Sequence, residues 1–185
     1  MDTMTRPQTG MRQIDQRLID QRQIDQREFR AVCGSFVTGV TVVTASSASG
    51  SHGSTVNSFT SLSTEPPQVV VCLARNTQTL RHVRASGRFA VNILAAGQTD
   101  VARIFASKSP DKLGQVGWHV AENGAPLLDG AVSTLECDVA TMQEEATHML
   151  VIGRVTAVRH DQDAAPLVFF RSTISAGDSL QHGVG

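Results

Sequence analysis

The stretch "HGSTVNSFTSLSTEPPQVVVCL", residues 52–73, joins two unlike patterns. Its first part carries seven hydroxyl side chains, one asparagine and one phenylalanine, and it ends at a double proline. Residues 68–73 are then almost entirely apolar and rich in valine, which is typical of a buried strand. Small hydroxyl and amide groups favour turns, because they satisfy nearby backbone groups, and they also suit the lining of a polar, uncharged ligand site. The stretch by itself does not distinguish a turn from a ligand site, so the rest of the sequence is needed.

Most of the other signals along the chain are strand signals. Short helical patterns occur only at residues 29–36, in a helix that Thr77 caps before Gly87, and in a helix that Thr99 caps. Because these helices are too few for a parallel sheet, we predict a mainly β fold in which an antiparallel barrel closes on itself and helices pack at its edges. Runs rich in valine and threonine, bounded by turn residues, predict strands at residues 36–45, 68–74, 88–96, 133–139, 148–160 and 166–171.

The composition limits function and location. The 185 residues are 41% hydrophobic, which suits one compact domain. The net charge of -1 argues against nucleic-acid binding, and no apolar run approaches the roughly 20 residues that a membrane span needs. The three cysteines stand far apart, so neither a zinc site nor a disulfide framework is indicated, and we expect no metal. The first ten residues lack the apolar segment of a signal peptide, so we expect a soluble, cytoplasmic protein.

A short repeat marks the N-terminal part of the chain. Residues 12–27 repeat a five-residue unit of Arg, Gln or Leu, Ile, Asp and Gln. Because five is not a helical period, the isoleucines would rotate around a helix instead of forming one apolar stripe. We therefore expect a polar leader, helical or disordered, over residues 1–27, a folded domain over residues 28–175 and a tail over residues 176–185.

Familiar catalytic motifs are absent from the sequence. It contains no glycine-rich dinucleotide or nucleotide loop, no zinc-protease helix motif and no hydrolase nucleophile motif. Its six histidines are scattered singly, and its carboxylates show no catalytic pairing. If the protein is an enzyme, a cofactor rather than the side chains would carry the reaction.

Six segments together resemble one known family, the flavin reductase-like proteins with an FMN-binding split barrel. Their order and spacing are most similar to the reductase components of two-component flavin monooxygenases. The resemblance implies a split β-barrel of Greek-key type and a homodimer that binds flavin near the subunit interface. It also implies hydride transfer from NADH or NADPH and release of reduced flavin to a separate oxygenase. The segments are "FVTGVTVVTA" (36–45), "HGSTVNSFTSLSTEPPQVVVCL" (52–73), "TLRHVRASGRFAVNILAAGQTDVARIFA" (79–106), "GAPLLDGAVSTLECDV" (124–139), "THMLVIGRV" (147–155) and "PLVFFR" (166–171).

The resemblance also assigns flavin-contacting residues. Reduction of a flavin pushes negative charge onto the pyrimidine end of its ring, and uncharged donors are sufficient to stabilise that charge. We expect contacts from two segments of the chain, through Thr55, Asn57, Ser58, Thr60, Ser61, Asn92, Leu94, Gln98, Arg103, Phe105, Ser107 and Lys108.

Two of these assignments have alternatives. A polar Asn92 inside an apolar strand is costly unless it is paired, so it either ties two strands together or contacts the ligand, and we favour the ligand. Lys108 and Lys112, the only lysines, would form a phosphate clamp with Ser107, or belong to a plain solvated loop, with Arg103 as the other candidate cation.

His148 is the candidate catalytic residue. In the family, the corresponding strand opens with Gly-Asp-His, a motif associated with binding of the nicotinamide cofactor. Here Ala146 and Thr147 precede the histidine, which puts in doubt any role that needs the aspartate or a backbone angle open only to glycine. We expect His148 to donate a hydrogen bond to the nicotinamide amide or to a flavin oxygen. A structural histidine at a strand start is the alternative, and no proton source is required, because hydride passes directly between stacked rings.

The sequence thus predicts an NADH-dependent flavin reductase. It would reduce FAD, or FMN, with NADH, or NADPH, and supply free reduced flavin to a partner monooxygenase. Weak flavin binding is expected, because tight binding would block release. The alternatives are an FMN-retaining oxidase and a non-catalytic flavin- or haem-binding barrel.

Overall fold

The computed structural model describes residues 24–177, in two units of which the second begins at Gly34. The first unit contains helix α2 (Gln26–Cys33), which starts and ends about three residues before the predicted helix at 29–36. Asp25 caps α2, because its carboxylate accepts hydrogen bonds from the backbone N–H groups of Arg27 and Glu28 at 2.8 and 3.0 Å. Most of the predicted leader and most of the predicted tail lie outside the described residues.

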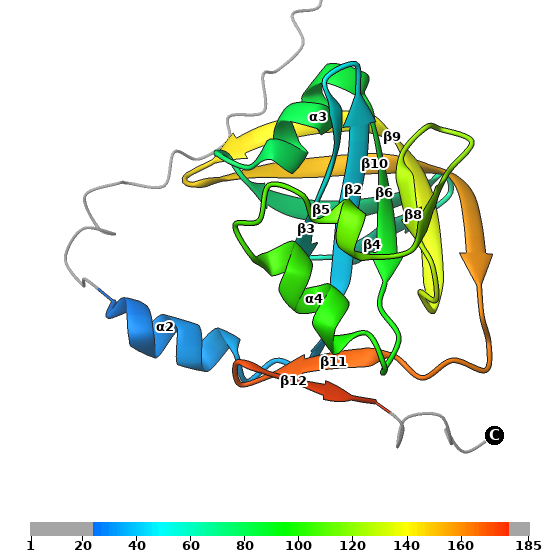
Figure 1. The fold of residues 1–185 in the computed structure, drawn as a ribbon. Helices are drawn as coiled ribbons and strands as arrows, with labels where there is room; N and C mark the ends of the chain where they lie inside the picture. Colours follow the sequence, from blue (N-terminus) through cyan, green and yellow to red (C-terminus); the bar gives the residue numbers. More distant parts are fainter. Residues whose placement is uncertain (1–23, 178–185) are drawn as a thin grey trace, which may run out of the picture. The chain divides into compact units, whose positions relative to one another are not determined.

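One seven-stranded sheet dominates the second unit (Figure 1). Its strand order is β3-β2-β6-β9-β10-β5-β4, and every neighbouring pair is antiparallel. The expectation of a mainly β fold with few helices is confirmed. The strands are β2 (Thr41–Ser47), β3 (Gly50–Val56), β4 (Thr60–Thr64), β5 (Pro67–Ala74), β6 (Arg88–Ile93), β9 (Ser133–Glu145) and β10 (His148–His160).

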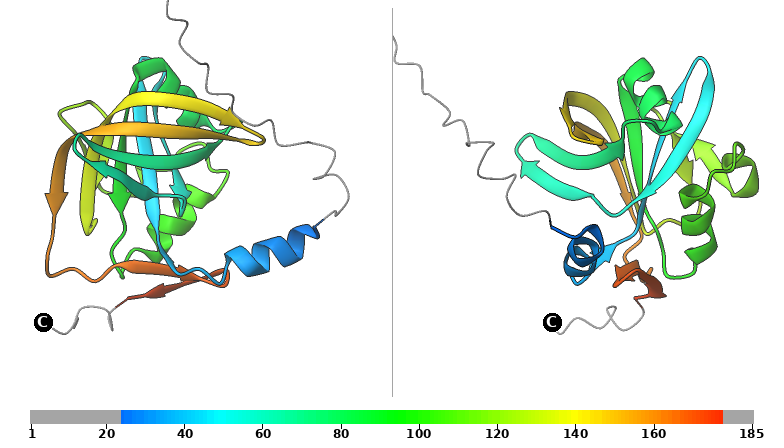
Figure 2. Two further views of the ribbon diagram at one scale, coloured as in Figure 1. Left: turned by 180° about the vertical axis from the view of Figure 1, so that it is seen from behind. Right: turned by 90° about the vertical axis from the view of Figure 1, so that its left-hand side faces the viewer.

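The two edge strands of this sheet, β3 and β4, are consecutive in the chain. In the right-hand view of Figure 2, the β2–β3 and β4–β5 hairpins diverge, and α3 (Gln78–Ser86) lies between them at one end. No ladder joins β3 to β4 among residues 24–177, so the predicted closure of the barrel is not confirmed.

A side chain takes the place of a strand at this split. Beyond the ladder that pairs Thr60 with Val70, the Ser58 hydroxyl donates to the carbonyl of Cys72 at 3.1 Å and accepts from its N–H at 3.0 Å. The backbone groups of Cys72 are therefore satisfied although β4 does not extend this far along β5, and the connection between β3 and β4 is held against β5.

Two large apolar clusters and a small one around Leu127 form the core of the described residues. The first lies inside the curved sheet, where β5 alternates between the buried side chains of Val69, Val71 and Leu73 and half-buried neighbours. The second lies under α4 (Thr99–Ala106) and includes the fully buried Val42 and Leu167. The smaller elements are β1 (Thr38–Gly39), β11 (Leu167–Phe170) and β12 (Thr173–Ala176) in one sheet, β7 (Trp118–Val120) and β8 (Pro126–Leu128) in another, and the 3₁₀ turn η1 (Leu113–Gln115).

The ends of α3 and α4 test the helix-capping residues that the sequence predicted. For α3 the prediction is confirmed, because the Thr77 hydroxyl accepts from the N–H of Leu80 and Gly87 ends the helix at φ 68°. For α4 the predicted Thr99 cap is wrong, because Gln98 occupies the capping position and Thr99 is the first helical residue. None of the helices within the described range is long and apolar enough to span a membrane.

Gly153 provides a test of the packing inside the sheet. A Cβ atom at this position of β10 would lie 2.8 Å from Cε1 of the fully buried Phe89 and 2.9 Å from Cβ of Cys137. Since neither neighbour can move into free space, Gly153→Ala should lower the free energy of unfolding by about 1–3 kcal/mol in urea titrations. Gly39→Ala is the control, because a Cβ there meets nothing within 4 Å. Equal losses in the two variants would contradict this account.

Candidate functional site

The donor-rich stretch lies where the sheet is split. Asn57 is exposed between β3 and β4, and Thr60 and Ser61 are exposed at the start of β4. Within residues 24–177 the side chains of Asn57 and Ser61 have no protein hydrogen-bond partner, and the Thr60 hydroxyl contacts only the carbonyl of Ser61, at 3.3 Å. Edge strands also leave backbone groups without ladder partners. The split therefore offers a group of uncharged donors to a ligand.

Two other predicted residues use their hydroxyls inside the protein. Thr55 donates to the carbonyl of Ala102 at 2.7 Å and so ties β3 to α4. Ser58 holds the connection between β3 and β4 against β5, as described above. These two side chains position the stretch, whereas Asn57, Thr60 and Ser61 face outward from it.

The predicted residues of α4 spread along the helix. Gln98 accepts from the N–H of Ala95 at 2.9 Å, donates to the carbonyl of Asp129 at 2.8 Å, and lines a small cavity of about 210 Å³. The helix of eight residues is about 12 Å long, so its two ends do not converge on one phosphate group. The remaining predicted residues lie further along. Arg103 is exposed and paired with Asp100 at 3.2 Å, the Ser107 hydroxyl donates to the carbonyl of Ile104 at 2.7 Å, and Lys108 is exposed.

Asn92 belongs to the core and not to a ligand site. Its exposed fraction is 0%, and its amide nitrogen donates to the carbonyl of Val42 at 3.1 Å and to the Thr44 hydroxyl at 3.2 Å. Its amide oxygen accepts from the N–H of Leu128 at 2.8 Å. Every polar atom of the amide is thus paired, so Asn92 ties strands together, and the ligand contact that we favoured is corrected.

Leu94 and Phe105 require the same correction. Their exposed fractions are 0% and 1%, and both pack in the cluster under α4. Both backbone groups of Leu94 are also used, in hydrogen bonds with Val40 and Leu167. Sequence similarity could not separate these packing residues from their ligand-facing neighbours, because both kinds occur in one continuous segment.

Lys112 is not part of a solvated loop. Only 6% of the residue is exposed, and its ammonium group donates to the carbonyls of Phe105 at 2.8 Å and Gly53 at 3.2 Å. Burial lowers the pKa of this amine below its usual value. Lys112 therefore ties β3 to the end of α4 and does not clamp a phosphate directly.

His148 stands exposed at the start of β10, in a turn that retains the geometry of a glycine turn. Ala146 adopts a φ of 47°, in the left-handed region, so the backbone angle does not depend on glycine here. Arg75 holds the turn, because its backbone N–H donates to the carbonyl of Thr147 at 3.1 Å and its guanidinium donates to that of Ala146 at 3.2 Å. The His148 Nδ1 lies 2.9 Å from the Thr147 hydroxyl, and β5 separates its strand from β4.

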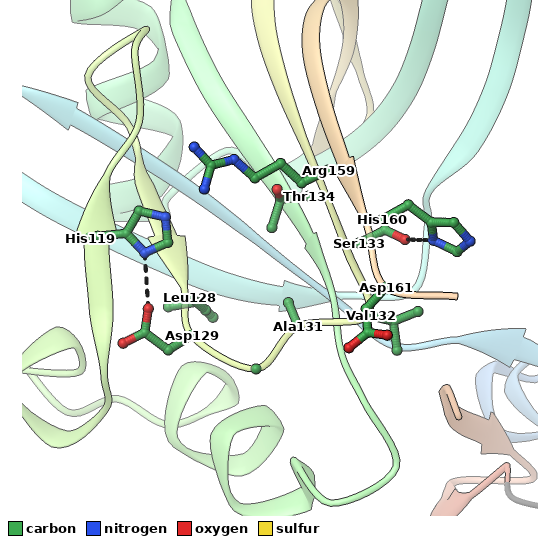
Figure 3. A pocket seen from close by; sticks show the side chains of 11 residues that line it. His119, Leu128, Asp129, Ala131, Val132, Ser133, Thr134, Arg159, His160 and Asp161 are labelled. Atoms are coloured by element: carbon green, nitrogen blue, oxygen red, sulfur yellow. Dashed lines mark hydrogen bonds and ion pairs between the residues drawn. The ribbon is translucent and has the colours of Figure 1, made fainter. Parts of the chain in front are cut away.

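Sequence reasoning missed a polar cavity of about 280 Å³ beside the end of β10 (Figure 3). The His119 Nδ1 lies 2.9 Å from Asp129, and the His160 Nδ1 lies 2.7 Å from the Ser133 hydroxyl, as the dashed lines in Figure 3 show. None of the predicted site residues lines this cavity. Its lining residues come from three separate parts of the sequence, 119, 128–134 and 159–161, so no local motif marks it.

A further cavity, of about 510 Å³, lies beside the β2–β3 turn and α3, and Lys108 lines it. His52 and His82 also line it. The Nδ1 of His52 is hydrogen-bonded to the Thr79 hydroxyl at 2.8 Å, and the Nδ1 of His82 to the Ser47 hydroxyl at 2.8 Å. Burial first, and then the charges of Lys112 and His82, lower the pKa of His52 from 6.5 to about 4. Lys108 thus lines the same cavity as two histidines, a grouping that the sequence did not reveal.

Comparison with known proteins agrees with this architecture. Residues 33–178 match the model of the flavin reductase like domain, so the chain belongs to that family. It is 38% identical over 145 residues to the reductase subunit HsaB of a flavin-dependent monooxygenase from Mycobacterium tuberculosis, covering 77% of this chain and 78% of that one.

Two further proteins extend the comparison. A probable flavin reductase of Rhizobium meliloti is 42% identical over 129 residues, which are 69% of this chain but only 42% of that protein's length. The solved structure of the NADH:FAD oxidoreductase SgcE6 of Streptomyces globisporus, in complex with NAD and FAD fragments, superposes with a TM-score of 0.78 at 37% identity. That match covers 81% of this chain and 91% of that one.

Two asparagines form a matched pair for a stability test. Asn92→Ala should lower the free energy of unfolding by about 2–4 kcal/mol, because it leaves the buried N–H of Leu128 unpaired and removes packed atoms. Asn57→Ala, which removes an exposed amide that has no hydrogen-bond partner within residues 24–177, should change it by less than about 0.5 kcal/mol. Urea unfolding measures both. A tolerated Asn92→Ala would show that the amide network has no structural role.

His52 should make stability depend on pH. Because its pKa of about 4 in the folded protein lies below the usual 6.5, protons bind preferentially to the unfolded chain. The contribution of neutral His52 is therefore complete above pH 6.5 and is lost as the pH falls toward 4. Urea unfolding near pH 7.5 and pH 5 should show a smaller decline for His52→Gln than for the unaltered protein. His160→Gln, at an exposed histidine, should retain the full decline.

Proposed function

We propose that this protein is an NADH-dependent flavin reductase that reduces FAD, or FMN, and releases the reduced flavin to a separate monooxygenase. The observation that carries the proposal is the group of outward-facing, uncharged donors at the split between β3 and β4. Membership of the flavin reductase like family supports it, as does the similarity to the monooxygenase reductase subunit HsaB and to the NADH:FAD oxidoreductase SgcE6.

The donors fit the charge of a reduced flavin. When bound, the flavin supplies a ring that takes up two electrons and gains negative charge at its pyrimidine end. Asn57, Thr60 and Ser61 would donate hydrogen bonds there, at a place whose geometry is held by the buried bonds of Thr55 and Ser58. Because none of these donors is charged, binding stays weak enough for the product to leave.

His148 has a supporting role in this proposal. NADH would give its hydride directly to the flavin ring and become NAD⁺, and solvent would supply the accompanying proton. His148, exposed and held in a fixed turn by Arg75, would donate a hydrogen bond to the nicotinamide amide or to a flavin oxygen. The side chain would orient the reactants rather than provide the proton.

We also infer a homodimer in the cytoplasm. Leu150 pairs with Cys72, and Ile152 pairs with Val70, across β10 and β5. All four side chains remain half-buried, so they form a continuous apolar strip that a second subunit would cover. This strip lies next to β4, which supports a flavin site near the subunit interface.

The proposed activity is tested by following NADH and NADPH oxidation by purified protein with added FAD, with FMN and without flavin. Turnover that depends on added flavin would support a reductase with a diffusible flavin, and the better flavin and nucleotide would be identified directly. A protein that stays yellow through gel filtration but consumes neither nucleotide would instead indicate the FMN-retaining oxidase or the binding protein.

Removing one donor should weaken flavin binding. For Asn57→Ala, loss of one hydrogen bond should raise the Kd for oxidised flavin about 3- to 10-fold, as measured by quenching of flavin fluorescence. The matched control is Ser175→Ala, which removes an exposed hydroxyl from β12, in the smaller sheet. An Asn57→Ala variant that binds flavin as tightly as the control would place the ring elsewhere.

A further inference from the structure

We propose that the polar cavity beside the end of β10 binds a small α-amino acid, which it holds by both the carboxylate and the ammonium group (Figure 3). The cavity has a volume of about 280 Å³. Pockets for drug-sized ligands measure roughly 300–1,000 Å³, so this one suits a smaller molecule. No residue that we assign to flavin or nicotinamide binding lines it, so its ligand is separate from the proposed reaction.

An unpaired guanidinium and an unpaired hydroxyl lie together in this cavity. Arg159 of β10 stands directly opposite Thr134 of β9 in the ladder, so their side chains share one face of the sheet. Thr134 is only 8% exposed, yet neither its hydroxyl nor the Arg159 guanidinium has a protein partner within residues 24–177. In Figure 3 the hydroxyl points toward the Arg159 side chain. A ligand carboxylate would accept hydrogen bonds from both groups.

Hydrogen-bond acceptors form another wall of the same cavity. The Nδ1–H of His119 donates to Oδ1 of Asp129 at 2.9 Å, and the second oxygen of this carboxylate has no partner in the described part of the chain. In the neutral ring the Nε2 of His119 is a further acceptor. The ammonium group of a ligand carries three N–H donors, so it would bond both Asp129 and His119.

The presence of both signs of charge favours a zwitterion over a simple ion. Arg159 and Asp129 line one cavity, but no ion pair joins them in the structure as described for residues 24–177. A lone carboxylate bound to Arg159 would face the carboxylates of Asp129 and Asp161, and a lone amine would face the guanidinium. A molecule with both groups satisfies both walls. The lining also includes the buried apolar side chains of Leu128 and Val132, which suit an apolar amino-acid side chain.

Calorimetric titration of the full chain, without flavin or NADH and at low ionic strength, tests the charge pattern. The probes are L-leucine, isocaproate, which lacks the amino group, and isoamylamine, which lacks the carboxylate. L-Leucine should bind about tenfold or more tightly than either analogue, because only leucine uses both walls. Absence of leucine binding, or an analogue that binds as tightly as leucine, would overturn the proposal. The assay involves no turnover, so a failed reductase assay leaves this result unaffected.

Two arginines of β10 place the binding in this cavity. Arg159→Gln should raise the Kd for L-leucine about tenfold or more, since a charge-assisted hydrogen bond is lost. The matched control is Arg154→Gln, which removes an exposed arginine of the same strand that pairs with Asp138 and does not line the cavity. This variant should stay within about twofold of the unaltered protein. Equal losses in the two variants would indicate only a general charge effect and would refute the site.

Thr134→Val separates ligand binding from folding. Valine has nearly the shape of threonine, and the hydroxyl that it lacks has no protein partner within residues 24–177, so the urea midpoint of unfolding should not fall. The Kd for L-leucine should still rise about 3- to 10-fold, because one hydrogen bond to the carboxylate is lost. Unchanged leucine binding in this variant would contradict the proposed position of the carboxylate.

Discussion

The hydrogen bonds between the Ser58 side chain and the backbone of Cys72 fix the place where the chain passes from β3 to β4. A sheet that ends in two open edges must satisfy or expose the backbone groups along them. Here one hydroxyl satisfies both backbone groups of Cys72, in the part of β5 that β4 does not cover, and so fixes the short connection between β3 and β4 against β5. The exposed side chains of Asn57, Thr60 and Ser61 therefore lie where the chain passes between the two edge strands.

Buried polar groups hold the surroundings of the split in place. Asn92 ties β6 to β2 and to Leu128, and Lys112 ties β3 to the end of α4. Such groups are costly to bury unless their hydrogen bonds are made, so each permits only one arrangement of the segments that it joins. The position of α4 relative to β3, which Thr55 also secures, follows from these constraints more than from apolar packing alone.

The two ends of β3 differ in electrostatic character. Near Asn57 the available groups are uncharged, which suits a ligand that binds and leaves. Near His52 the groups are basic, and a buried ammonium lies behind them without a carboxylate partner among the described residues. Charge-assisted hydrogen bonds are roughly twice as strong as neutral ones, so the two ends of β3 differ in the strength of the hydrogen bonds that they can offer.

Local patterns were enough to find β2, β5, β6, β9, β10 and β11 and the capping of α3 by Thr77 and Gly87, because each depends on residues close together in the chain. They did not find the edge strands β3 and β4, whose hydroxyl-rich sequence is also typical of turns. The sequence could not show that Leu94 and Phe105 face the core, that Asn92 bonds across strands, or that the ring of His82 faces the same cavity as Lys108. Those properties depend on partners 20 or more positions away and on burial, which exist only once the sheet has curved and α4 has packed against it.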